Sequence, residues 1–229
     1  MLCYTAYVNP TEWAKQNKKQ LVQQIVGNAQ SAPDDEKPLA LFAAGVPGAG
    51  KTEFLDSLLA HIPDIVRIDM DEIVKLFDGY SPENYYRFRG AANIIVDEVV
   101  IYCRRHRLDF ALDGTFASPR AVENVRSALK RHNVAIVYVW KEPSLAWQHT
   151  KDRQLVTKRG IEKVGFIKSC IDTPMNIRTA KEKFGNKIAI LAIKKDIQNN
   201  TFQLIRDPSQ IDNLLEKHYT ESILERTLS

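Results

Sequence analysis

The stretch that decides the fold reads LALFAAGVPGAGKTEFLDSLL and spans residues 39–59. It opens with a short apolar run that ends in glycine, which is typical of a buried parallel strand. Its last part has helical spacing, because Phe54, Leu55 and Leu58 fall on one face. The segment between strand and helix, residues 45–52, matches the pattern G-x-x-x-x-G-K-T. Strand, loop and helix together predict a phosphate-binding P-loop.

The chemistry of phosphate binding explains the residue types in this loop. Glycines let backbone N–H groups curl around a phosphate, and the following helix N-terminus adds a partial positive charge. Lys51 is expected to reach the β- and γ-phosphates, and the Thr52 hydroxyl to hold Mg²⁺. A glycine-rich turn that binds nothing is the alternative, which the full match between a strand and a helix disfavours. We therefore expect ATP and Mg²⁺ as cofactors. The predicted nucleotide-binding residues are Gly45, Gly48, Ala49, Gly50, Lys51 and Thr52.

Strand and helix patterns alternate along the rest of the chain. This alternation predicts an α/β fold with a doubly wound, mostly parallel sheet flanked by helices, whose ligands bind at the carboxyl ends of the strands. Further strands are expected at 65–68, 108–112, 134–140, 187–193 and 202–205. Helices are expected at 11–30, shortly after residue 71, at 83–107, from Ser118-Pro119 to about 131, at 144–153 and 166–184, and one final helix after Pro208.

The composition limits the class of protein. The chain has 229 residues, of which 44% are hydrophobic, and a formal charge of +4, which suits one domain with short appendages. Lys and Arg are scattered, which argues against a nucleic-acid partner but suits a phosphate-bearing substrate. Cys3, Cys103 and Cys170 form no CxxC pair and are expected to be reduced. No apolar stretch has transmembrane length and no signal-peptide pattern opens the chain, so we expect a cytoplasmic protein without membrane partners.

Two acids, Asp69 and Asp71, follow the second predicted strand at the same edge of the sheet as the P-loop. Side chains alternate along an extended chain, so both carboxylates can bracket one site. Phosphoryl transfer uses an acid that accepts the proton of the attacking hydroxyl, and Asp71 is our candidate for that base. The alternative is that an Asp after a strand only caps the next helix.

Other candidate acids lie at a third strand end and within a helix. Asp113 ends an apolar strand and resembles the acid that holds Mg²⁺ through water in P-loop enzymes, with Thr115 beside it at the cleft. An ordinary Gly-Thr turn is the alternative. Asp97 and Glu98 lie mid-helix, where either one could bind substrate hydroxyls or belong to a solvated face.

A basic cluster made of Lys151, Arg153, Lys158 and Arg159, followed by Gly160, lies between two predicted helices. A mobile loop that carries arginines over the phosphates can stabilise the charge of the transferring group and exclude water when it closes. We interpret this segment as such a lid, with Arg153 and Arg159 as its important residues. An exposed basic helix end is the alternative.

Four segments in this order resemble the zeta-toxin family of P-loop kinases. They are the loop AAGVPGAGKT at 43–52, IDMD at 68–71, LDGT at 112–115 and KDR at 151–153. The resemblance covers roughly residues 21–193, including the amphipathic helix and linker before the loop. The P-loop is shared by many kinases, whereas its combination with the Ile-x-x-Asp and (Asp/Glu)-Gly-Thr turns is more specific.

This resemblance implies phosphorylation of a UDP-N-acetylhexosamine at its 3′-hydroxyl, and a small antitoxin protein that restrains the enzyme. It implies that Lys51 binds ATP phosphates, that Asp71 activates the sugar hydroxyl, and that Arg153 and Arg159 hold the phosphates. Asp97 falls at the spacing of the family's substrate-binding glutamate. The predicted substrate-binding residues are Asp69, Asp97, Asp113 and Thr115, and the predicted Mg²⁺ ligands are Thr52 and Asp113.

Two features depart from the family pattern. Well-known members carry Glu-Gly-Thr-Gly-Arg where this chain has DGTFA at 113–117, so the arginine that meets the sugar nucleotide has no counterpart there. The lid is also shorter between its arginines. The expected domain organisation is an N-terminal helical extension and linker over 1–37 and a P-loop kinase domain over 38–229.

Two other functions compete with a sugar-nucleotide kinase. A 5′-hydroxyl polynucleotide kinase also uses a P-loop and an Asp after the second strand, but such enzymes usually place an arginine soon after that Asp, and residues 72–75 contain none. A nucleotide-gated binding module with slow hydrolysis is the other alternative, and a simple switch has no need of a lid.

Overall fold

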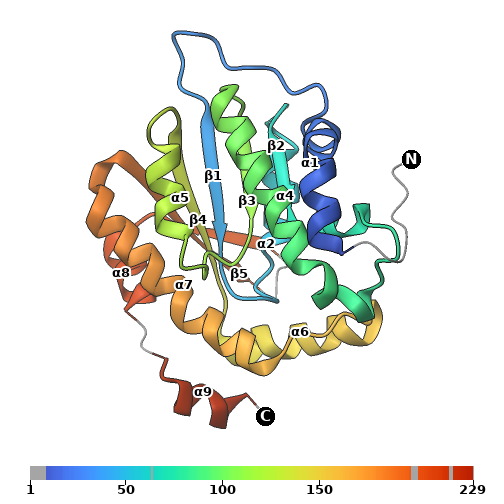
Figure 1. Cartoon of the computed structure of the whole chain (residues 1–229). Helices are drawn as coiled ribbons and strands as arrows, with labels where there is room; N and C mark the ends of the chain where they lie inside the picture. The colour runs from blue at the N-terminus through green and yellow to red at the C-terminus, as the bar shows by residue number, and fades with distance from the viewer. Residues whose placement is uncertain (1–8, 63, 197–200, 217–218, 229) are drawn as a thin grey trace.

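A six-stranded sheet with the order β2-β3-β1-β4-β5-β6 forms the centre of the molecule in a computed structural model that describes residues 9–62, 64–196, 201–216 and 219–228 (Figure 1). Five strands pair in parallel, and β6 pairs with β5 in the antiparallel direction. The strands are β1 (Leu39–Ala44), β2 (Val66–Asp69), β3 (Phe110–Asp113), β4 (Asn133–Trp140), β5 (Ile188–Asp196) and β6 (Thr201–Ile205). The predicted mostly parallel α/β fold is confirmed.

Helices cover both faces of this sheet. They are α1 (Pro10–Val26), α2 (Lys51–Leu59), α3 (Met70–Ile73), α4 (Tyr85–Arg105), α5 (Ala121–Ala128), α6 (Pro143–Thr157), α7 (Lys163–Phe184), α8 (Pro208–Leu215) and α9 (Glu221–Thr227). Single 3₁₀ turns lie at Val74–Leu76, Pro82–Asn84 and Gly185–Lys187. Helix α6 runs across the carboxyl ends of the strands, below the sheet in Figure 1. None of the helices in the described ranges is long and apolar enough to cross a membrane.

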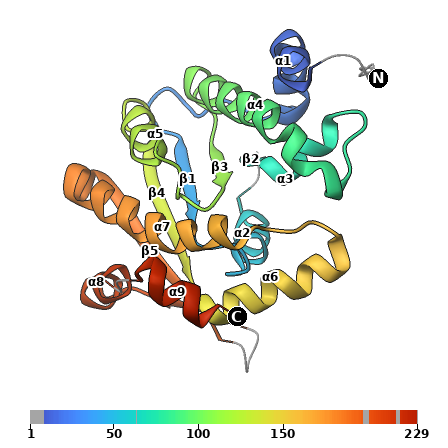
Figure 2. The same cartoon turned by 60° about the horizontal axis from the view of Figure 1, so that its bottom comes forward.

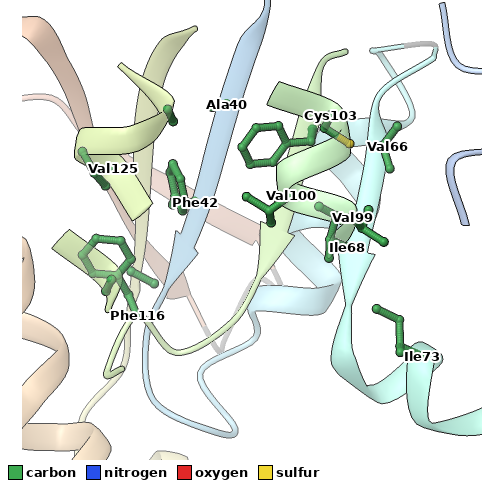
Figure 3. Close-up of a cluster of buried hydrophobic side chains, with 14 of the residues drawn as sticks. Ala40, Phe42, Val66, Ile68, Ile73, Val99, Val100, Cys103, Phe116 and Val125 are labelled. Atoms are coloured by element: carbon green, nitrogen blue, oxygen red, sulfur yellow. The ribbon is translucent and has the colours of Figure 1, made fainter. Parts of the chain in front are cut away.

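Alternation along β1 divides the core into two layers. Ala40 and Phe42 point to the face that is covered by α1, α4, α5 and the later part of α7, whereas Leu41 and Ala43 point to the face covered by α2, α9 and the start of α7. Figure 3 shows the first layer, where Phe42 lies near Phe116 of the loop after β3. A strand with both faces buried has no polar side, which explains the continuous apolar run of β1.

The sheet order brings three predicted site segments to one edge. The chain passes from β1 through α2 to β2 on one side, whereas β4 pairs on the other side of β1, so the order reverses next to the P-loop. Open α/β sheets bind ligands at such a reversal, beyond the carboxyl ends of the strands. In the parallel register of β2 and β3, Asp69 lies directly opposite Asp113.

Several helix predictions differ from the structure. Helix α1 ends at Val26 and not at 30, and α6 continues to Thr157, so Lys151 and Arg153 lie on this helix and not in a loop between two helices. Helix α5 begins at Ala121 and not after Ser118, because the Arg120 and Ala121 N–H groups donate to the Ser118 hydroxyl and carbonyl and close a separate turn. The final segment holds two helices, α8 and α9, where one was expected, and Thr220 starts the second by accepting from the Ile223 N–H. Cys103 and Cys170 are buried free thiols, and Cys3 lies outside the described residues.

Candidate active site

The P-loop follows β1 and is held by its neighbours on both sides. The Gly45 N–H donates to the carbonyl of Thr115 (3.2 Å), which connects the loop to the turn after β3. Gly48 has a φ of 75° and packs so closely on α6 that an added Cβ would lie 2.7 Å from the Thr150 hydroxyl. A side chain at Gly48 would therefore clash as well as strain the backbone. The predicted loop residue Ala49 is fully buried.

Lys141 holds the P-loop through a hydrogen bond, and the sequence analysis did not predict this role. Its buried Nζ donates to the Gly48 carbonyl (3.1 Å) and contacts Nδ1 of the exposed His149 (2.9 Å). Burial lowers the pKa of Lys141, and burial together with the Lys141 charge lowers the pKa of His149. Because Lys141 directly follows β4, its place beside the loop depends on the pairing of β4 with β1.

Lys51 points into the loop, where its Nζ donates to the carbonyl of Val46 (3.0 Å). Burial lowers its pKa, and the carboxylates of Asp113 and Asp71 oppose that effect. The ammonium is therefore held in a poorly solvated place among negative groups, where a phosphate can replace the carbonyl as its partner.

Thr52 and Asp113 come together as predicted, with 3.4 Å between Thr52 Oγ1 and Asp113 Oδ2. Mg²⁺ prefers oxygen ligands and is usually held by one or two protein oxygens together with phosphates and water. These two side chains offer only oxygens at the mouth of the loop, so the donor set fits Mg²⁺.

Arg67 on β2 joins these acids and was missed by the sequence analysis. Its guanidinium pairs with Asp56 of α2, lies 2.9 Å from Asp113 Oδ2 and 3.7 Å from Asp69 Oδ2. Burial opposes the charge of Arg67, but hydrogen bonds to Asp56 and Asp113 outweigh it and raise its pKa. Arg67 and Asp69 are two residues apart on a strand and so share a face, which is the signal that could have revealed the pair.

Asp69 caps helix α3. Its Oδ1 accepts from the Asp71 N–H at 2.8 Å, which is the capping bond that the alternative for this position expected. Burial, followed by the nearby Asp113 carboxylate, raises the pKa of Asp69 to about 6. The capping bond leaves Oδ2 as its second oxygen, and that oxygen faces Arg67.

The predicted base and the predicted lid arginines meet in the structure. Arg159 forms an ion pair with Asp71 Oδ2, and Arg153 Nη2 of α6 lies 3.9 Å from the same oxygen. Lys158 ends α6 with a φ of 61° and turns the chain, and Arg159 then contacts Asp71 of α3 and Tyr85 at the start of α4. Figure 2 shows the loop that leads from the end of α6 to α7. Burial opposes the charge of Arg159, but Asp71 outweighs it and raises the pKa of this guanidinium. Arg159 is 20% exposed and Arg153 is 60% exposed.

The two remaining predicted residues, Thr115 and Asp97, have different surroundings. The Thr115 hydroxyl accepts from the Ala117 N–H (3.3 Å), and its carbonyl accepts from Thr173 (2.8 Å) as well as from Gly45. Asp97 on α4 is 48% exposed and pairs with Arg120 at 3.1 Å. The structure therefore brings Asp69, Asp71, Asp113 and the lid together, and places Asp97 in a separate ion pair.

Comparisons with known proteins concern the sequence family and the fold. A family model described as Zeta toxin matches residues 23–206. The solved structure of the PezAT chromosomal toxin-antitoxin system of Streptococcus pneumoniae is similar over 100% of this chain and 98% of that chain, with a TM-score of 0.67 and 15% identity. The AvrRxo1-ORF1:AvrRxo1-ORF2 complex with ATP matches 93% of this chain and 74% of that chain, with a TM-score of 0.67 and 9% identity.

A putative kinase from Chloroflexus aurantiacus matches 81% of this chain and all of its own length, with a TM-score of 0.53 and 12% identity. No curated protein matches the sequence. At these identities the solved structures establish the likeness of the fold.

Proposed function

The chain belongs to the zeta-toxin family, and from that premise we propose that it transfers the γ-phosphoryl group of ATP to a hydroxyl of a sugar nucleotide of the UDP-N-acetylglucosamine type. The observation that supports this most directly is the meeting of Asp71 with Arg153 and Arg159. A base and two guanidinium groups at the edge of a P-loop are the parts that phosphoryl transfer to a hydroxyl needs.

Each side chain has a role that its position supports. The backbone of residues 45–52 cradles the phosphates, and Lys51 exchanges its bond to the Val46 carbonyl for phosphate oxygens. Thr52 and Asp113 would hold Mg²⁺, which neutralises charge on the phosphates when bound. Arg153 and Arg159 stabilise the negative charge of the transferring group, since a guanidinium presents a planar fork of donors to two oxygens.

Asp71 acts as the general base in this scheme. Arg159 pairs with its Oδ2 and Arg153 lies 3.9 Å from the same oxygen, which leaves Oδ1 for the acceptor hydroxyl. That hydroxyl gives its proton to Asp71 as its oxygen bonds to the γ-phosphorus, and the bond from this phosphorus to the bridging oxygen of ADP breaks. Asp69 is less suited to accept the proton, because one of its oxygens caps α3 and the other faces Arg67.

The acceptor and the protein partner rest on the family. The PezAT relative is a toxin-antitoxin system, and we propose that this chain is likewise a cytoplasmic toxin restrained by a small antitoxin protein. We propose that Asp69, Asp97, Asp113 and Thr115 contact the acceptor. Because the turn after β3 lacks the family's arginine, the pyrophosphate of the acceptor is held in part by other residues.

Transfer of radiolabel from γ-labelled ATP tests this function. The reaction is run with Mg²⁺ and UDP-N-acetylglucosamine, with a 5′-hydroxyl oligonucleotide, or with no acceptor, for the wild type, Lys51→Ala and Asp71→Asn. We expect labelled sugar nucleotide with the wild type only. Asp71→Asn should lose about 10²- to 10⁴-fold in kcat while ATP affinity stays within about threefold, because the amide cannot accept the proton.

Asp212→Asn serves as the control. Its ion pair with Lys181 lies near the end of α7, where the chain enters the amino end of β5, whereas the proposed site lies at the carboxyl ends of the strands. Label on the oligonucleotide alone would replace the sugar nucleotide by a nucleic-acid acceptor. Phosphate release that is the same in all three mixtures would indicate a nucleotide-gated module. Wild-type turnover in Lys51→Ala would contradict the P-loop assignment.

A further inference from the structure

The first residue of α4, Tyr85, lies under the lid. Its ring centroid is 4.1 Å from the guanidinium carbon of Arg159, a distance at which a cation is attracted to an aromatic face. Tyr85 is buried with 8% exposure, so the contact is shielded from water. The same guanidinium carries the ion pair to Asp71, so Arg159 is held by a charge on one side and a ring on the other.

Tyr85 is also fixed to the segment that carries the acids. Its hydroxyl donates to the sulfur of Met70 at 3.3 Å, and Met70 lies between Asp69 and Asp71 in the sequence. The ring therefore keeps one position relative to the base and to the guanidinium.

The ion pair and hydrogen bond to Asp71 hold one end of the Arg159 guanidinium and leave the direction of its plane undetermined. A carboxylate attracts a cation from many directions, and Asp71 already has Arg153 near the same oxygen. The Nε of Arg159 is buried and has no hydrogen-bond partner among the described residues, so hydrogen bonding does not fix the plane of the guanidinium at that atom. A ring face accepts a guanidinium best when the two planes stack, which supplies the missing constraint.

We propose that Tyr85 is a positioning residue that acts through Arg159: its ring holds the guanidinium at a set place beside Asp71, so that the lid delivers Arg159 to the transferring phosphoryl group in one orientation. This role rests on the proposed kinase function and deepens it. It assigns to the start of α4 a part in lid closure that neither the P-loop nor the acidic strand ends supply.

Kinetics of Tyr85→Leu and Tyr85→Phe test the proposal. Leucine removes the ring face, and we expect a loss of roughly 3- to 30-fold in kcat with little change in the KM for ATP. Phenylalanine keeps the face and should stay within about twofold of the wild type, although it loses the bond to Met70. In an Arg159→Gln background, Tyr85→Leu should cost almost nothing more, because the group that it holds is gone.

The matched control is Tyr102→Leu. Tyr102 lies near the other end of the same helix, where it stacks on His106 with 4.0 Å between ring centroids. Thermal melting of every variant separates a loss of folding from a loss of positioning. The proposal is overturned if Tyr85→Leu keeps the wild-type kcat, or if it costs as much in the Arg159→Gln background as in the wild type.

A second measurement needs no acceptor, so it decides the matter even if the proposed kinase function fails. Trypsin cleaves after Lys158 and Arg159, and the ring contact should protect the second bond in the protein without nucleotide. We expect cleavage there to be several-fold faster in Tyr85→Leu than in the wild type, with Tyr85→Phe and Tyr102→Leu unchanged. Equal cleavage rates in Tyr85→Leu and the wild type would show that the ring does not hold the lid.

Discussion

Asp69 combines a structural and an electrostatic role in one side chain. Its capping bond to Asp71 stabilises the turn after β2, while its burial near Asp113 opposes its charge. Asparagine caps helices as well as aspartate does but carries no charge. Asp69→Asn therefore separates the two roles.

The pH dependence of Asp69→Asn follows from the raised pKa. A pKa of about 6 in the folded protein, against an ordinary 3.8, means that the folded state binds this proton more tightly. Protonated Asp69 therefore contributes to the free energy of unfolding below pH 4, and this contribution is lost as the pH rises through 6. The loss is about 2–3 kcal/mol above pH 6. We expect Asp69→Asn to unfold in urea with a higher free energy than the wild type at pH 8 and a similar one at pH 4.

The measurement is made in EDTA and without nucleotide, so that no bound cation contributes. Asp35→Asn in the exposed linker is the control. A difference in the free energy of unfolding that is the same at pH 4 and pH 8 would contradict the role of the Asp69 charge.

Residues with a motif could be predicted from the sequence, and residues whose partners lie elsewhere could not. The P-loop pattern identified Lys51 and Thr52 because loop geometry depends on neighbours in the chain. The contacts of Arg67 with Asp56 and of Lys141 with Gly48 depend on how β2 and β4 pack beside α2 and the P-loop, and local spacing encodes only the shared face of Arg67 and Asp69. Tyr85 lies in the helix predicted at 83–107, and its contact with Arg159 joins residues 74 positions apart, so the local pattern does not indicate it.

At the scale of elements, the positions of the two lid arginines predict effects of different size on kcat. Arg159 contacts Asp71 and is mostly buried, whereas Arg153 is 3.9 Å away and largely exposed. We expect Arg159→Ala to lower kcat by about 10²- to 10³-fold and Arg153→Ala by less, both with smaller effects on the KM for ATP. Lysine should recover only part of either loss, because it is a point charge on a flexible stem.

These four variants are compared by steady-state kinetics with the acceptor that proves active. If the kcat of every variant stays within about threefold of the wild type, the basic cluster is a solvated helix end and the lid lies elsewhere. A larger effect at Arg153 than at Arg159 would mean that closure exchanges their positions.

Most helices and strands were predictable because burial determines which positions along each element are apolar. Both faces of β1 and β4 are covered, so their sequences are continuously apolar and read as strands. The predicted start of α5 was wrong. The Ser118 hydroxyl accepts from the Arg120 N–H in a separate turn, and this bond replaces the helix cap that the Ser-Pro pair indicated. The break between α8 and α9 carries no glycine or proline to mark it.

At the scale of the whole molecule, α1 belongs to the main core. Trp13, Leu21 and Val22 are buried in the layer that also contains α4, and the Trp13 and Phe77 rings lie 5.1 Å apart. Burial of such side chains contributes about 1.5–3 kcal/mol each, so α1 supplies on the order of 5 kcal/mol or more. That is comparable to the whole stability of a typical domain.

We therefore expect the full chain to unfold cooperatively in urea and residues 38–229 alone to lack that transition. We expect Trp13→Ala to lower the free energy of unfolding of the full chain by about 3–5 kcal/mol. Circular dichroism and urea titration of both proteins provide the measurement. A truncated chain that unfolds within about 1 kcal/mol of the full one would instead support a kinase domain that is independent of residues 1–37.

Helix α6 contacts the P-loop and also carries one of the two lid arginines. Near its middle, Thr150 packs against Gly48, and Arg153 lies about 5 Å further along the axis at 1.5 Å per residue. A helix transmits displacement as a stiff rod, so Arg153 moves with the phosphate loop. Arg159 lies beyond the left-handed residue Lys158, where the rod ends. The position of Arg153 is therefore set by the helix axis, whereas the position of Arg159 depends on its own contacts with Asp71 and Tyr85.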